Sequence, residues 1–245
     1  MYKPAPMQEK KVFIKTFGCQ MNVYDSNRML RSLSSEYSPT ENIQEADLIL
    51  FNTCSVREKA EHKIMSSLGK LKKSKESNPN LVIGVGGCVA NQNGGELLKK
   101  ASHLDLVFGV DQIEELPKLV NRVRQDERLA EVDYKQEYSF YAVNRLEKPQ
   151  SQAKVSEYVS IIQGCDKPCT FCIVPSTRGF EKSRDLKEIQ REVQSLRDSG
   201  AQEIVLLGQN VNGYKTHEHT LEDLIQALSD IPRLRYITSH PNDVT

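Results

Sequence analysis

The sequence predicts a parallel α/β protein in two parts, a Rossmann-like βαβ domain followed by an α/β barrel that is incomplete. In the first part, apolar strand-like runs alternate with helical patterns, and the runs lie at 11–19, 47–54, 81–88 and 105–109. The second part shows a β-α-β-α-β succession, with strands expected at 158–162, 203–208 and 235–239. Strands that alternate with helices form parallel sheets. Because three strands cannot close a barrel, we expect this chain to be a fragment of a longer protein.

Composition limits the classes of function. Of 245 residues, 38% are hydrophobic and 27% charged, which is typical of a globular protein with a substantial core. Lys+Arg and Asp+Glu both number 33, so any nucleic acid would have to be bound by local patches. No signal peptide or membrane-length apolar run is present, and we expect a cytoplasmic protein. Six cysteines in a reducing compartment indicate ligands or catalysts rather than disulfides.

Three segments are expected along the chain. Residues 1–10 indicate a flexible tail, residues 11–148 the first domain, and residues 149–245 the barrel part. The boundary lies near Pro149, in a charged stretch of poor periodicity. Four aromatic residues in this stretch could stack on RNA bases, but packing against the flanking domains is the favoured interpretation: Tyr134, Tyr138, Phe140 and Tyr141.

Three cysteines occur on one short loop, GCDKPCTFCIVPSTRG at 164–179. Their spacing is Cys165-x3-Cys169-x2-Cys172. Three thiolates can bind three irons of a cubane iron–sulfur cluster and leave the fourth iron open. A closed zinc site needs a fourth ligand, yet no cysteine follows Cys172, and His217 and His219 are more than forty residues away. Structural zinc and a redox dithiol are the alternatives for this loop.

The other three cysteines each end a predicted strand. Cys19, Cys54 and Cys88 lie 35 and 34 residues apart, a period that suits parallel βαβ crossovers. Since the carboxyl ends of parallel strands share one edge, these thiols are expected to converge on a second three-thiolate metal site. The alternative is that each is a small buried core residue. The glycines at 84–87 match no phosphate-binding motif, so nucleotide binding is rejected.

With both cysteine sets, the chain resembles the methylthiotransferase family of radical S-adenosylmethionine (SAM) enzymes. The resemblance rests on TFGCQMNVYDS (16–26), NTCSVREKAEHK (52–63), GVGGCVA (84–90), the cysteine loop and LLGQNVNGY (206–214). It implies an N-terminal methylthiotransferase domain and the first part of a radical SAM barrel. The residues around Cys19 and Cys54 favour the branch that acts on N6-dimethylallyladenosine in tRNA, next to the anticodon. The remaining barrel strands and a C-terminal RNA-binding domain are not in this sequence, so the chain alone is expected to be inactive.

The resemblance also implies cofactors, partners and roles. A [4Fe-4S] cluster on Cys165, Cys169 and Cys172 would bind SAM and generate a radical. A second [4Fe-4S] cluster on Cys19, Cys54 and Cys88 would carry the sulfur. Partners would be the tRNA anticodon stem-loop and an electron donor such as flavodoxin or ferredoxin, with the enzyme a monomer.

SAM contacts are assigned to Gln209, Asn210 and Arg178. For Gln209 and Asn210, the alternative is that their amide side chains only stabilise a turn. For Arg178, the alternatives are an RNA phosphate and a surface ion pair. His62, His103 and His240, like the lysines at 70–75, are interpreted as ordinary polar residues. Competing functions are the same chemistry on threonylcarbamoyl-adenosine or on a ribosomal-protein aspartate, and a non-catalytic iron–sulfur or zinc protein.

Overall fold

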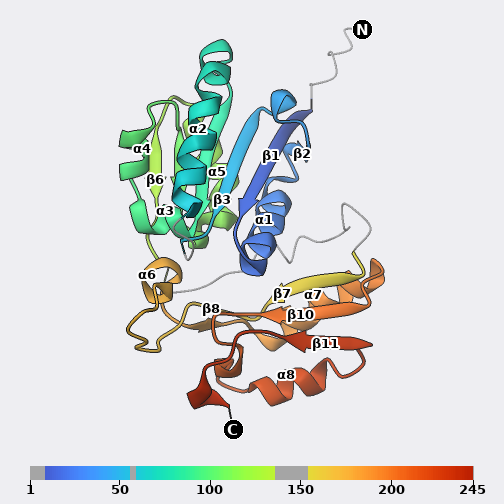
Figure 1. Cartoon of the computed structure of the whole chain (residues 1–245). Helices are drawn as coiled ribbons and strands as arrows, with labels where there is room; N and C mark the ends of the chain where they lie inside the picture. Colours follow the sequence, from blue (N-terminus) through green and yellow to red (C-terminus); the bar gives the residue numbers. More distant parts are fainter. Residues whose placement is uncertain (1–8, 56–58, 136–153, 245) are drawn as a thin grey trace, which may run out of the picture.

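The computed structural model describes residues 9–55, 59–135 and 154–244, which form two stacked α/β units (Figure 1). The boundary near residue 149, most of the expected tail, and Tyr138, Phe140 and Tyr141 fall outside these ranges. Within them, none of the helices combines the length and the apolarity that crossing a bilayer would demand.

The first unit is a six-stranded sheet in which every neighbouring pair is parallel, in the order β2-β1-β3-β4-β5-β6. This order is the flavodoxin type of doubly wound sheet, whose switch point lies between β1 and β3. The strands are β1 (Lys10–Phe17), β2 (Tyr37–Pro39), β3 (Leu48–Thr53), β4 (Val82–Gly87), β5 (Leu106–Phe108) and β6 (Leu129–Glu131).

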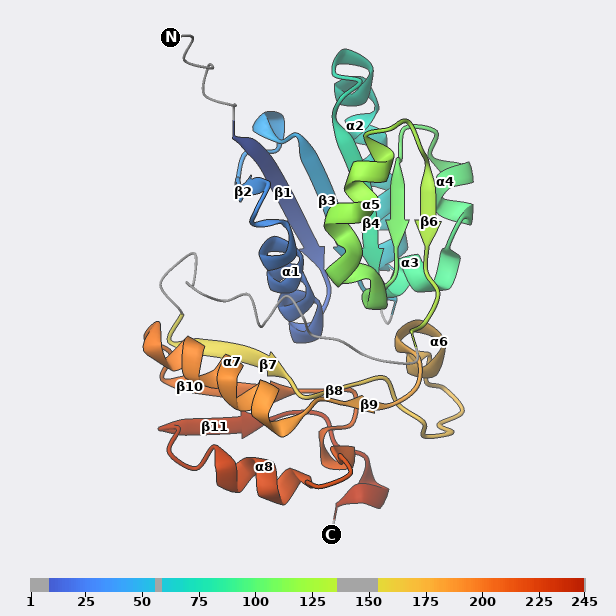
Figure 2. The same ribbon diagram turned by 180° about the vertical axis from the view of Figure 1, so that it is seen from behind.

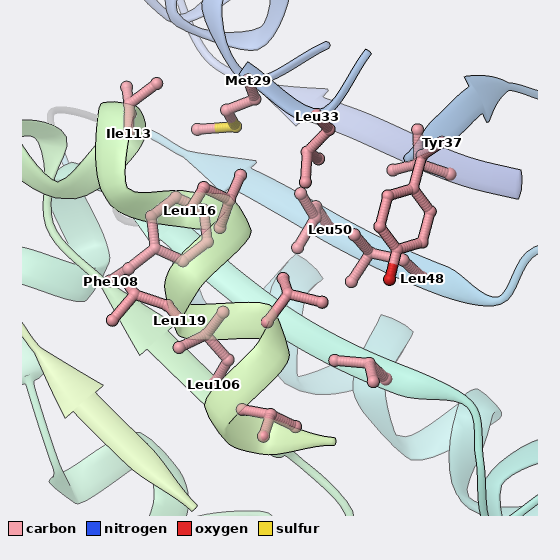
Figure 3. Packing of buried hydrophobic residues seen from close by; sticks show 14 of the residues in the cluster. Met29, Leu33, Tyr37, Leu48, Leu50, Leu106, Phe108, Ile113, Leu116 and Leu119 are labelled. Atoms are coloured by element: carbon pink, nitrogen blue, oxygen red, sulfur yellow. The ribbon is translucent and has the colours of Figure 1, made fainter. Parts of the chain in front are cut away.

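Helices cover both faces of this sheet. On one face, α1 (Gln20–Leu33), η2 (Val110–Glu115) and α5 (Leu116–Val123) pack over a core that includes Met29, Leu50 and Phe108 (Figure 3). On the other, α2 (Lys59–Ser77), α3 (Cys88–Asn93) and α4 (Glu96–Lys100) pack over Phe51 and Val85. Burial on both faces explains why β3 and β4 consist of continuously buried residues rather than alternating ones.

The second unit has a three-stranded parallel sheet in the order β11-β10-β7. Its strands are β7 (Ser156–Ser160), β10 (Glu203–Leu207) and β11 (Arg233–Tyr236), and α7 (Leu186–Asp198) and α8 (Leu221–Ala227) cover one face. No closed barrel forms among the described residues, and β11 has no partner beyond β10 there. The incomplete α/β barrel expected from the sequence is therefore what the structure has.

Several local expectations are corrected. The spacing of Met29, Leu33 and Tyr37 in the sequence predicts that all three lie on one helix, but α1 ends at Leu33 and Tyr37 begins β2. A proline within a helical pattern predicts a kinked or split helix at Pro117, but Pro117 stands in the first turn of α5, where its missing N–H costs nothing. The last strand begins at Arg233, two residues earlier than expected. The pattern Asp185-x-x-Glu188 predicts the start of a helix, and Asp185 does cap α7, where it accepts hydrogen bonds from the backbone N–H groups of Lys187 and Glu188.

The two units share a buried interface. Met21 and Tyr24 of α1 pack on Val205 and Leu207 of β10, so the first unit covers part of the sheet face that α7 and α8 leave open. The hydroxyl of Tyr24 donates to Glu192 of α7, which also pairs with Arg31 of α1. Figures 1 and 2 both show α6 (Val174–Arg178) between the first unit and the second sheet.

Candidate metal centres

The structure places the three strand-end cysteines at one edge of the first sheet. The register aligns Phe17 of β1 with Thr53 of β3, and Thr53 with Gly87 of β4. Cys19, Cys54 and Cys88 follow these residues by two, one and one positions. Cys19 and Cys54 therefore flank the switch point between β1 and β3, where doubly wound sheets bind ligands.

The Cys19 thiol is readily ionised. A hydrogen bond with the Cys54 side chain lowers its pKa; burial opposes this, while backbone N–H groups at the start of α1 and the charge of Arg178 add to it. The net pKa of Cys19 is about 5. Because the thiolate is the form that binds metals, the lowered pKa makes Cys19 suited to metal binding at neutral pH.

A buried amide network holds the ends of α1 and β3 together. The Asn22 side-chain amide donates to the Asn52 side chain at 3.2 Å and to the Thr53 carbonyl at 3.1 Å. Asn52 in turn donates to the Asn22 carbonyl at 2.7 Å. These residues lie next to Cys19 and Cys54, so the network fixes both cysteine backbones. Sequence patterns alone do not reveal this network, although Asn52 and Thr53 stand directly before Cys54.

Close backbone packing also fixes the third cysteine. Gly87, just before Cys88, has φ of +90°, a conformation that side-chain-bearing residues rarely adopt. A Cβ there would lie 2.5 Å from the Thr53 carbonyl oxygen. The glycine therefore lets β4 turn abruptly into α3, with Cys88 as its first residue.

A side chain from the second unit completes the surroundings of this first site. Nη2 of Arg178, the last residue of α6, donates to Asp25 Oδ2 on α1 at 2.7 Å. Burial alone would lower the pKa of Arg178, but the carboxylate of Asp25 and the sulfur of Cys88 raise it. Tyr134 lies against the same helix and donates to the Ser176 carbonyl at 2.7 Å, which is the interdomain packing expected of it. Arg178 is 3% exposed, so it is not the surface ion pair that the sequence allowed.

The second site is a loop that leaves and re-enters a small antiparallel pair, β8 (Ile162–Gln163) and β9 (Lys182–Ser183). Gly164 begins the loop with φ of +78°, and a Cβ there would lie 2.0 Å from the Phe180 carbonyl oxygen. The Gly164 N–H donates to the side chain of Gln209 at 2.7 Å. The loop therefore has a fixed base, and Gln209 anchors it.

Histidine reaches this loop from the far end of the chain. His240 Nε2 lies 3.4 Å from Cys169 Sγ. Burial raises the pKa of Cys165, while Cys169 and Cys172 are partly exposed. His240, which the sequence indicated only as an ordinary polar residue, therefore lies within hydrogen-bond distance of a cysteine of the second triad. Only the fold, which brings residues 71 positions apart together, could reveal it.

The segment that carries His240 is itself tied to the loop. Asp243 accepts from Lys167 Nζ at 2.7 Å and from the Asn210 amide at 2.6 Å. Asn210 Oδ1 accepts the backbone N–H of His240 at 3.0 Å. Gln209 and Asn210 thus make the turn-stabilising contacts that were the alternative to SAM binding; a direct contact of either with SAM stays a prediction.

The remaining polar candidates have structural contacts. A ring nitrogen of His103 lies 2.7 Å from the Leu68 carbonyl oxygen, and Lys75 pairs with Asp105 at 2.9 Å. His62 is exposed on α2.

Each set of three cysteines matches the number of thiolates that a cubane cluster with one open iron requires. Across the described ranges, no three histidine, cysteine or carboxylate side chains stand together so as to hold one metal ion. A closed zinc site needs four donors on one ion, whereas each thiolate of a cubane cluster binds its own iron. The buried Nη1 of Arg178, beside the first triad, lacks a hydrogen-bond partner in the described part of the chain. An acceptor such as cluster sulfur would satisfy it.

Comparison with known proteins agrees with the two-part architecture. Residues 11–109 match the model described as Uncharacterized protein family UPF0004, and residues 159–244 match the Radical SAM superfamily. A solved structure of the radical SAM methyltransferase TsrM from Kitasatospora setae, with cobalamin and a [4Fe-4S] cluster bound, shares the fold. Its TM-score is 0.60 at 12% identity, over 94% of this chain and 54% of that one.

Curated relatives named tRNA-2-methylthio-N(6)-dimethylallyladenosine synthase match nearly the whole chain. The relative from Paraburkholderia phytofirmans is 45% identical over 96% of this chain and 54% of its own length. The relative from Methylobacillus flagellatus is 47% identical over 96% and 55%. The chain therefore spans about half the length of the curated relatives it matches.

Proposed function

We propose that this chain, a member of the radical SAM methylthiotransferase family, carries both cysteine sites of an enzyme that adds a methylthio group to C2 of N6-dimethylallyladenosine in tRNA. One observation carries the proposal: the two cysteine triads belong to two different α/β units that share a buried interface. A metal-storage or structural protein has no need of two triads arranged in this way.

The first triad would hold one [4Fe-4S] cluster, and the second would hold another, to which SAM binds. When bound, these groups supply the radical and sulfur chemistry that an unactivated C–H bond requires. The protein's own part is to hold them. The amides of Asn22 and Asn52 fix the first site, and Gln209 with Gly164 fixes the base of the second. The interface excludes water between the two units at Tyr24, Asp25 and Glu192, each of which is buried.

Partners follow from the same proposal. The substrate would be the anticodon stem-loop of tRNA, and a flavodoxin or ferredoxin would donate electrons. The enzyme would act as a monomer in the cytoplasm. Of the three residues that the sequence assigns to SAM, Gln209 and Asn210 lie beside the second triad and would be neighbours of SAM, whereas Arg178 lies at the first site.

The proposal is tested by mass spectrometry of tRNA nucleosides from a strain that lacks the full-length gene. We expect loss of the 2-methylthio nucleoside and accumulation of N6-dimethylallyladenosine. The full-length wild-type gene and a control variant at the exposed His217, His217→Ala, should restore it, and Cys169→Ala or Cys54→Ala should not. Unchanged methylthio content in the deletion strain would contradict the proposal. Loss of a modified threonylcarbamoyl-adenosine, or of a modified ribosomal protein, would instead assign the chain to one of the other branches.

A further inference from the structure

Arg178 belongs to the second unit by sequence but to the first site by position. It follows Cys172 by six residues, at the C-terminal end of α6. Its side chain nevertheless points out of the second unit and ends against α1 of the first. The SAM-type cysteine loop therefore delivers a permanent positive charge to a cysteine site on a different sheet.

Two elements that begin at first-site cysteines converge on this arginine. Asp25, which accepts from Nη2 at 2.7 Å, lies on α1, and Cys19 immediately precedes that helix. α6 also packs against α3, which starts at Cys88. Both Arg178 and Asp25 are almost fully buried, at 3% and 1% exposure.

One of the three guanidinium nitrogens of Arg178 is buried without a hydrogen-bond partner among the described residues. Nη1 of Arg178 and Oδ1 of Asp25 are buried and make no hydrogen bond with any of the described residues, although Oδ1 also lies 3.6 Å from Nη1 of Arg28. An unpaired buried donor costs about 1–3 kcal/mol, and more when it is charged, so native structures almost always satisfy it. The side chain of Cys88 lies close enough to Arg178 to raise the pKa of the guanidinium.

We propose that Arg178 is a positioning residue for the first site, and that its Nη1 donates a charge-assisted hydrogen bond to sulfur there, either the Cys88 thiolate or a sulfide of the cluster it holds. The two units then build one site together: the first supplies three thiolates and the second supplies the counter-charge. This inference rests on the proposed function only in requiring an iron–sulfur cluster on Cys19, Cys54 and Cys88.

The chemistry favours arginine at this position over lysine. A guanidinium offers parallel donors in a fixed plane and stays charged when buried. One edge can therefore hold Asp25 while another donor faces the sulfur. An ammonium group would retain the charge but could not reach both partners in the same geometry.

The test measures the midpoint potential of the first cluster in the full chain, reconstituted anaerobically, with Cys165, Cys169 and Cys172 all replaced by Ala. Hydrogen bonds and charges near the sulfurs set such potentials. Arg178→Gln should shift the potential to a more negative value and speed loss of iron to a chelator. Arg178→Lys should restore part of the shift. The control Arg31→Gln removes another interdomain ion pair, at the far end of α1, and should leave the potential unchanged.

A second variant guards against simple misfolding. Asp25→Asn removes the negative charge that partly neutralises Arg178, so it should shift the potential in the opposite, positive direction. Equal potentials for Arg178→Gln and Arg31→Gln, in protein with native circular dichroism, would overturn the inference and leave the proposed function intact. Failure of any cluster to assemble on Cys19, Cys54 and Cys88 while Arg178 is present would overturn both.

Discussion

Cys169 and His240 are joined by a hydrogen bond whose direction the structure fixes. Nδ1 of His240 accepts from the backbone N–H of Asn242 at 3.3 Å, so the ring proton resides on Nε2. Nε2, 3.4 Å from the sulfur, is then the donor to Cys169 Sγ. The His240 ring thereby orients one sulfur of the second triad.

Replacing His240 should weaken the second site without abolishing it. In His240→Ala the sulfur loses a donor, so the midpoint potential of a cluster bound there should become more negative. The measurement is a redox titration of the full chain with Cys19, Cys54 and Cys88 replaced by Ala. His219→Ala is the matched control, because His219 lies in a turn and makes no contact with a cysteine among the interactions of the described residues. Equal potentials for both variants would contradict the assigned donor role.

Iron content should separate two cubane clusters from one metal ion. Two clusters require about eight irons and eight sulfides per chain after anaerobic reconstitution. Cys169→Ala and Cys54→Ala should each remove about half of this iron, and the double variant should remove nearly all of it. Ser176→Ala changes the second loop without removing a thiol, and serves as the control. About one zinc per chain, with no sulfide, would instead support the structural-zinc interpretation of the loop.

The paired amides beside the first site should matter for stability even without metal. Asn22 and Asn52 are fully buried and exchange hydrogen bonds. Replacing Asn52 with Leu leaves the Asn22 amide without one acceptor, and such a buried unpaired group costs about 1–3 kcal/mol. Urea unfolding of the apo protein should show this loss of unfolding free energy. Asn80→Leu, on an exposed turn, should change little; an equal loss there would mean that the amide network is not the cause.

The sequence was enough to group the six cysteines into two sets, because each set has a pattern that can be recognised without tertiary contacts. Cys19, Cys54 and Cys88 end strands, and parallel strand ends share an edge, so their convergence needed no knowledge of tertiary contacts. The capping role of Asp185 was predictable for the same reason, because an N-cap residue and the backbone groups that it binds lie within four positions of one another. Tyr37 was wrongly predicted to be helical because its spacing from Leu33 suits a helix. Its side chain does reach the same core as Leu33, but from the short strand β2.

The contacts that complete each site were beyond such rules. Arg178 meets Asp25 across 153 residues, and Cys169 meets His240 across 71. Periodicity shows which side of an element is buried, but not which residue of another unit lies against it. The charged pairs between the units therefore became visible only in the folded chain.

Acid should weaken the interface between the units through Glu192. Burial alone would raise the pKa of this fully buried carboxyl, but the charges of Arg184 and Arg31 lower it below its usual range. A group whose pKa is lower in the folded than in the unfolded state stabilises the fold above its unfolded pKa of about 4.3, and this contribution disappears as pH falls through the folded pKa. We therefore expect stability from this cluster to be constant near neutral pH and to decline below about pH 4.

Glu192→Gln isolates this contribution. At pH 7 the variant leaves buried Arg184 without its counter-charge, so unfolding free energy should fall by about 3–5 kcal/mol, the typical cost of breaking a buried pair. As pH is lowered below about 4, the wild-type advantage should shrink, because protonation of Glu192 produces the same neutral side chain. Urea unfolding across pH 3–8 measures both effects. Glu45→Gln, which breaks the exposed pair with Lys11, is the control and should show little effect at any pH. If the difference in unfolding free energy between wild type and Glu192→Gln were the same at pH 3 as at pH 7, the charge of Glu192 would not be what stabilises the contact between α7 and α1.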